Sequence, residues 1–156
     1  MKTAIDESQV RGNPTNADFD GKTLAGKNMS ENYNCWGASI ALNEGKKLEG
    51  KGSGTGVGIA DPSTFDAILS SDYEPTSQDD ATVGKTVVRF ADSSNESQHG
   101  ATFMGVDNSG NEYLFSKNGW QVQPEIHKTK YISTALPSYG TIQGINSGET
   151  GYYDKK

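Results

Sequence analysis

A turn-rich segment between two strand-like runs most constrains how this chain can fold. The runs 99–106 and 112–117 are rich in apolar and aromatic residues, and the turn residues 107–111, Asp-Asn-Ser-Gly-Asn, separate them. Asn, Asp and Gly readily adopt the backbone angles of tight connections between antiparallel strands. A third run, 86–91, is rich in β-branched residues and is typical of a strand. The sequence therefore predicts an antiparallel sheet around this hairpin.

Two short helices are predicted before the sheet. The range 34–43 begins with Asn34, a good N-cap, and carries apolar residues at helical spacing. The range 61–69 begins with the capping residue Asp61 and has Pro62 at its first helical position, again followed by apolar residues at helical spacing. Helices followed by an antiparallel sheet indicate an α+β fold.

The other segments are expected to be loops. Residues 1–30 show no sustained period and predict a linker or a loosely ordered arm. Glycine occupies every second position over 50–58, which predicts a loop, and the acidic stretch 72–80 is also expected to be a solvated loop. The tail from Tyr131 predicts a short helix or turn and a closing strand near 152–153. We therefore expect a single domain over 31–156.

Composition excludes several classes of protein. The 156 residues include one cysteine and two histidines, so no internal disulfide is possible, and the ligands fall short of a structural zinc site. No motif for a metal or cofactor is found, and a net charge of -6 disfavours nucleic acid as a partner. No apolar run is long enough to span a membrane, and no signal peptide is recognised.

The lone cysteine is the main candidate for chemistry. Cys35 lies where the first helix begins, and a helix N-terminus stabilises a thiolate, which is the nucleophilic form. A nucleophilic thiol also needs a group that moves protons near neutral pH, the usual role of imidazole. His127 lies outside the hairpin beside lysines and is expected to be solvated. His99, at the start of a strand, is expected on the sheet face that packs against the cysteine-bearing helix.

The hairpin register decides which polar side chain can orient His99. If Asp107 pairs with Glu112, His99 shares a sheet face with Ser116 and Asn118. A register shifted by one residue would instead bring the adjacent residues of the second strand onto that face. Asn118 is the first candidate under that register, and Ser116 is the reserve.

Three blocks of the sequence resemble papain-like thiol hydrolases. They are Asn-Cys-Trp-Gly-Ala-Ser at 34–39, the strand that opens with His99, and Ser-Lys-Asn-Gly-Trp at 116–120. Their order is most similar to the compact NlpC/P60 and CHAP hydrolases that cut peptidoglycan peptides. The stretch 99–119 also resembles C-terminal toxin domains of Rhs and related polymorphic bacterial toxins.

The resemblance implies a papain-like fold and a role for each matching residue. Cys35 would be the nucleophile, His99 the general base and acid, and Asn118 the orienting residue. The oxyanion would be held by the backbone N–H of Cys35 and by a side-chain amide, for which Asn32 and Asn34 are the candidates. Trp36 would shield the site.

These features together predict a cysteine hydrolase that cleaves an amide bond without a cofactor. The expected substrate is peptidoglycan stem peptide, and the expected setting is a toxin or effector domain that is secreted or delivered into a target cell. An immunity or inhibitor protein is a possible partner. Two alternatives remain open: a protease, glutamine deamidase or acyltransferase acting on proteins, and a non-catalytic binding module with an inert, buried Cys35.

Overall fold

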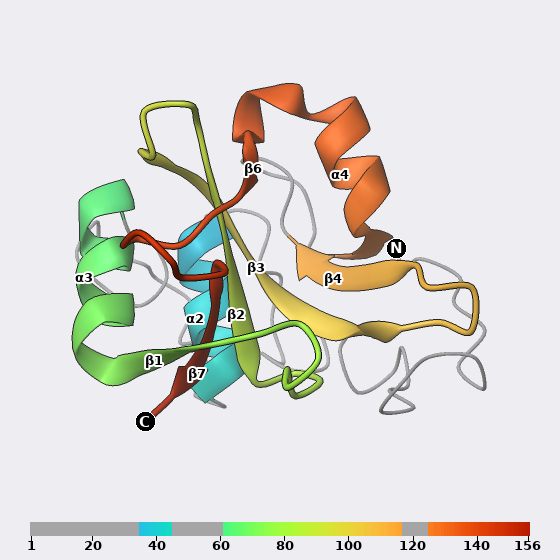
Figure 1. Cartoon of the computed structure of the whole chain (residues 1–156), viewed down its shortest axis with the longest axis horizontal. Coiled ribbons are helices and arrows are strands. Elements are labelled where there is room, and N and C mark those ends of the chain that lie inside the picture. The colour runs from blue at the N-terminus through green and yellow to red at the C-terminus, as the bar shows by residue number, and fades with distance from the viewer. Residues whose placement is uncertain (1–34, 45–60, 117–124) are drawn as a thin grey trace.

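The computed structural model describes residues 35–44, 61–116 and 125–156, and these residues form one antiparallel sheet with helices on both faces (Figure 1). The strand order is β1-β7-β2-β3-β4-β5, and β6 pairs with β2 beside this path. The strands are β1 (Tyr73–Thr76), β2 (Thr86–Ala91), β3 (Ser97–Val106), β4 (Glu112–Ser116), β5 (Glu125–Lys128), β6 (Thr141–Ile142) and β7 (Tyr152–Lys155). The expected arm 1–30 and the glycine loop 50–58 lie outside the described residues.

The helices divide between the two faces of the sheet. On one face lie α2 (Cys35–Glu44) and α3 (Pro62–Asp72). On the other lie α4 (Thr129–Ala135) and the 3-10 turn η2 (Pro137–Tyr139). Figure 1 shows α2 behind β2 and β3 in that view, with α4 next to β4. This arrangement confirms the expected α+β architecture.

Alternation along the inner strands separates two apolar layers. Val87 and Tyr153 pack with α2 and α3, whereas their neighbours Val88 and Tyr152 face α4. Successive side chains of a strand point to opposite faces, so a run in which every residue is buried indicates a sheet covered on both sides. Strand β2 is buried along its whole length, which is why four of the six residues in the predicted strand 86–91 are apolar.

Helix α3 begins as its sequence predicts. The Asp61 side chain accepts a hydrogen bond of 2.7 Å from the backbone N–H of Thr64, and Pro62 occupies the first turn. Phe65 and Leu69, four residues apart, are fully buried against the sheet. The N-cap and the apolar stripe together therefore fix where this helix starts and which side it buries.

The hairpin of β3 and β4 is confirmed, but its pairing differs from the expected one. Val106 pairs with Glu112, and an irregularity between Phe103 and Gly105 then brings Phe103 opposite Leu114. The pairs beyond this bulge are displaced by two residues from the expected register. A displacement of two residues keeps every side chain on its face of the sheet, so His99 and Ser116 still lie on the same face.

Two expected loops or surface segments are in fact strands. Part of the acidic stretch 72–80 forms β1, which pairs with β7 and buries Tyr73. Its partner lies at the other end of the described chain, so local composition gives no sign of the pairing. His127, expected to be solvated, lies in β5 opposite Leu114 and is half-buried, with its ring stacked on Tyr131.

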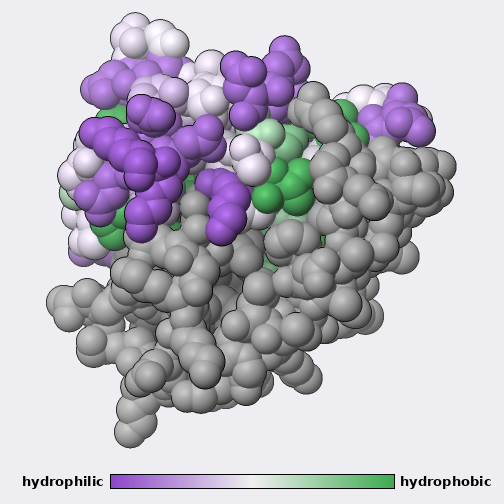
Figure 2. Space-filling model, turned by 90° about the horizontal axis from the view of Figure 1, so that it is seen from below, coloured by the Kyte–Doolittle hydropathy of each residue, from purple (hydrophilic) through white to green (hydrophobic). Residues whose placement is uncertain are grey.

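The face of the molecule seen from below is largely hydrophilic over the described residues (Figure 2). None of the helices in the described ranges is both long and apolar enough to cross a membrane.

Candidate active site

His99 is a fully buried histidine on the inner strand β3. Its exposed fraction is 0%, and its Nε2 atom lies 2.7 Å from Ser116 Oγ on the neighbouring strand. The other ring nitrogen, Nδ1, is buried and has no hydrogen-bond partner among the described residues. Buried polar atoms nearly always have a partner, so this nitrogen is an exception.

The imidazole is enclosed by aromatic rings. Tyr139 stacks on it with ring centroids 4.0 Å apart and planes 3° from parallel, and Phe90 meets it edge-on at 5.5 Å. Burial disfavours the charged ring and lowers the pKa of His99 to about 3. The ring is therefore neutral near pH 7 and has one nitrogen able to accept a proton.

Cys35 is the first residue of α2, as the sequence predicts, and it is half-buried. The next residue, Trp36, donates from Nε1 to Ser97 Oγ over 3.1 Å and packs at an angle against Phe65. This contact ties the first turn of α2 to the first residue of β3. The sulfur thus lies among helix N–H groups that have no intrahelical partners, an environment that favours the thiolate.

The imidazole does not lie on the sheet face that α2 covers, so that expectation was wrong. A side-chain carbon added at Gly100 would lie 3.0 Å from Ser39 Oγ of α2, and Thr102 Oγ1 donates to the Ser39 carbonyl. Neighbouring residues of a strand point to opposite faces, and His99 accordingly points toward η2. The alternation in the sequence fits either face, and nothing in it indicates which one α2 covers.

Tyr139 was not among the predicted site residues. Burial raises the pKa of its hydroxyl, and the charge of Cys35 raises it further. Its only signal in the sequence is an aromatic residue in a turn between Pro137 and Gly140.

The other predicted site residues divide into two groups. Ser116, the reserve for the orienting role, contacts His99, and Trp36 packs beside the start of β3 as a half-buried aromatic residue. Asn32, Asn34 and Asn118 lie outside the described residues.

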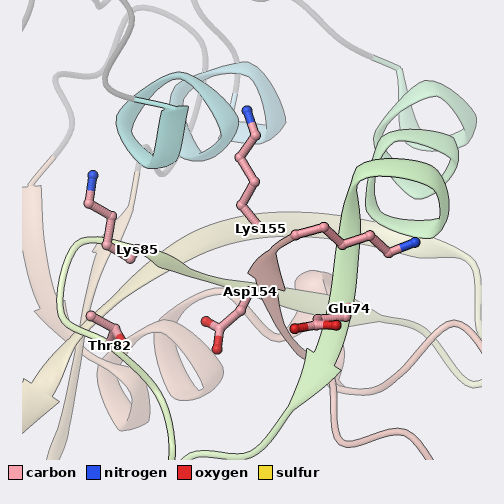
Figure 3. Close-up of a pocket in the computed structure, with 6 residues that line it drawn as sticks. Glu74, Thr82, Lys85, Asp154 and Lys155 are labelled. Carbon is pink, nitrogen blue, oxygen red and sulfur yellow. The ribbon is translucent and has the colours of Figure 1, made fainter.

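A hollow lies at one edge of the sheet, where β1 and β7 pair (Figure 3). Its volume is about 510 Å³, and it is lined by charged and polar residues: Glu74, Thr82, Lys85, Asp154, Lys155 and Lys156. Asp154 accepts a hydrogen bond of 2.5 Å from Thr86 Oγ1, which assigns this carboxylate to the sheet. In the described part of the chain, no three His, Cys, Asp or Glu side chains are grouped to hold a metal ion.

Comparison of the chain with protein-family models, with curated proteins and with solved structures finds no match.

Proposed function

We propose that this protein is a cysteine hydrolase that cleaves an amide bond, with Cys35 as nucleophile and His99 as general base and acid. The observation that carries the proposal is the state of His99: one nitrogen is held by Ser116, and the other is buried without a partner among the described residues. In the proposal Nε2 donates to Ser116 Oγ, which leaves Nδ1 as the nitrogen that accepts a proton.

The proposed reaction has two steps. The Cys35 sulfur attacks the carbonyl carbon while Nδ1 of His99 takes the thiol proton, and the C–N bond then breaks as that proton passes to the departing amine. Water next attacks the thioester, giving its proton to Nδ1, and the acid leaves as Cys35 recovers its hydrogen. Ser116 takes the orienting role in this scheme because its hydroxyl contacts Nε2.

The neutral state of His99 shapes the proposal. Because burial lowers the pKa of His99 to about 3, the imidazole is neutral in the resting protein. The helix N-terminus at Cys35 then supplies stabilisation for the negative charge that forms on sulfur during attack.

We further propose a papain-like arrangement and peptidoglycan stem peptide as substrate, in a toxin or effector that acts in or on a target cell. The support is the resemblance of the segments around Cys35 and His99 to NlpC/P60, CHAP and polymorphic toxin domains, together with a cysteine at the start of a helix that packs on an antiparallel sheet. An immunity protein would be the matching partner.

One observation favours a second candidate, a non-catalytic binding module. The body of α2 covers one face of the sheet, whereas His99 is fully buried on the other. In that case Cys35 is a packing residue, and His99 is a structural histidine in an aromatic layer.

Purified peptidoglycan treated with the protein tests the proposal. Wild type should release fragments with new amino termini, whereas Cys35→Ala and His99→Gln should lower the rate at least about 100-fold. His127→Gln is the matched control, because His127 lies on β5 and stacks on Tyr131, away from Cys35. Its rate should equal that of wild type.

The outcomes separate the candidates. Cleavage that persists in Cys35→Ala contradicts the hydrolase proposal. If the wild type leaves peptidoglycan intact, mass spectrometry of treated proteins distinguishes a protease, which cuts the chain, from a deamidase, which changes glutamine and leaves the chain uncut. Absence of every Cys35-dependent product favours the binding module.

A further inference from the structure

Tyr139 is held in place by elements that do not include α2. The turn η2 places its ring on His99, and Gly140 follows in a backbone conformation with φ of 79°. A side-chain carbon at Gly140 would lie 1.9 Å from the Ala91 carbonyl oxygen, so only glycine lets the turn dock so closely on the end of β2. The Gln143 amide then donates to the carbonyls of Ala91 and Asp92 over 3.0 and 3.1 Å.

The same strand end also holds the imidazole from a second side. Phe90 of β2 meets His99 edge-on and pairs with it across the strands, and Phe90 also pairs with Ile142 of β6. Tyr139, Phe90 and Ser116 therefore fix the ring from η2, β2 and β4.

We propose that Tyr139 is a positioning residue for His99: its ring fixes the imidazole plane and keeps water away from it. The inference rests on the proposed function and adds a residue that holds the histidine of that site. The two rings stack with centroids 4.0 Å apart and planes 3° from parallel, so Tyr139 covers one face of the imidazole.

Two variants test the ring. Tyr139→Leu removes the stacked ring, whereas Tyr139→Phe keeps it and removes only the hydroxyl. Around the imidazole, η2 presents Tyr139, β2 presents Phe90 and β4 presents Ser116. The readout is the titration of the His99 ring by NMR.

Tyr139→Leu should raise the pKa of His99 from about 3 toward its ordinary value of 6.5, because water then reaches the ring. Tyr139→Phe should leave that titration unchanged, because it keeps the stacked ring. An unchanged His99 titration in Tyr139→Leu, or the same shift in both variants, overturns the role of the ring.

The chain supplies a matched control. Tyr131 stacks on the other histidine, His127, with centroids 4.8 Å apart, and is 51% exposed. Tyr131→Leu removes a comparable ring pair and should leave the His99 titration unchanged. That titration does not require Cys35 to be catalytic, so failure of the hydrolase proposal shows in the peptidoglycan assay, and failure of this inference shows in the titration.

Discussion

Arg89 and Asp66 form a two-point ion pair that joins β2 to α3. Arg89 Nε and Nη2 donate to the two carboxylate oxygens of Asp66 over 2.9 and 3.1 Å, and the Arg89 side chain is 1% exposed. Its Nη1 and Nη2 atoms also donate to Asn95 and to the carbonyls of Gln143 and Gly144. One buried guanidinium thus holds a helix, a strand and two loops.

Arg89→Met should destabilise the protein by about 3–5 kcal/mol, because it removes the partner of a carboxylate and leaves three carbonyl groups with fewer donors. Asp66→Asn is the control: Arg89 keeps its carbonyl acceptors there, and the cost should be about 1–2 kcal/mol. Urea denaturation measures both. Equal losses for the two variants would show that the loop contacts contribute nothing.

Gly140→Ala tests how η2 is placed. Gly140 and Gly110 have similar positive φ angles of 79° and 84°, but an added carbon at Gly110 meets nothing within 4 Å, whereas at Gly140 it meets Ala91. Gly110→Ala should lower the free energy of unfolding only by the cost of a positive φ for alanine, about 1–2 kcal/mol. Gly140→Ala should lower it by at least about 2 kcal/mol more. Denaturation midpoints that agree for the two variants would rule out the close docking of η2 on β2.

Glu112 is a buried carboxylate that joins three parts of the fold. It accepts hydrogen bonds from Gln78 Nε2, Thr129 Oγ1 and Tyr152 Oη over 2.8, 2.5 and 2.6 Å. Glu112→Gln places an amide N–H among donors and should lower the free energy of unfolding, measured by urea denaturation, by about 1–3 kcal/mol. Tyr152→Phe leaves two of the three donors and should lower it by less. A Glu112→Gln variant as stable as wild type would contradict the need for an acceptor there.

The sequence predicted those elements whose signals are local. The strand 86–91 is rich in β-branched and apolar residues, the turn 107–111 consists of residues that favour tight turns, and Asp61 and Pro62 mark the start of α3. Strand β1 was missed because its partner β7 lies about 80 positions along the chain, and pairing at such a distance leaves no mark on the composition of either segment.

The candidate site was predicted in its residues but not in its geometry. Cys35 at a helix start and a strand histidine sharing a face with Ser116 follow from local patterns. The face of His99 relative to α2 depends on how the helix packs, and Tyr139 reaches the site through the docking of η2. Neither of these tertiary contacts produces a periodic pattern in the sequence.

Titration of His99 tests the burial of the site. The ring should stay neutral down to about pH 4, since burial lowers its pKa to about 3. NMR of the imidazole measures this, and His127→Gln assigns the remaining signal. A His99 ring that titrates near 6.5 would show that water reaches it.

The same pKa makes stability depend on pH. The unfolded chain takes up a proton on His99 near pH 6.5, whereas the folded chain does so only near pH 3. The contribution of the buried neutral ring is therefore complete above about pH 6.5 and declines as the pH falls toward 3. Between pH 7 and pH 5, wild type should lose about 2 kcal/mol more than His99→Gln. Equal losses would mean that His99 titrates alike in both states.

The most direct test of the central claim is the rate at which iodoacetamide alkylates Cys35 at about pH 6, compared with free cysteine. If Cys35 is a nucleophile served by His99, the folded wild type should react at least about tenfold faster than free cysteine, and His99→Gln should lose this advantage. A slow reaction that requires denaturant and is the same in both proteins would contradict the account and identify Cys35 as a packing residue.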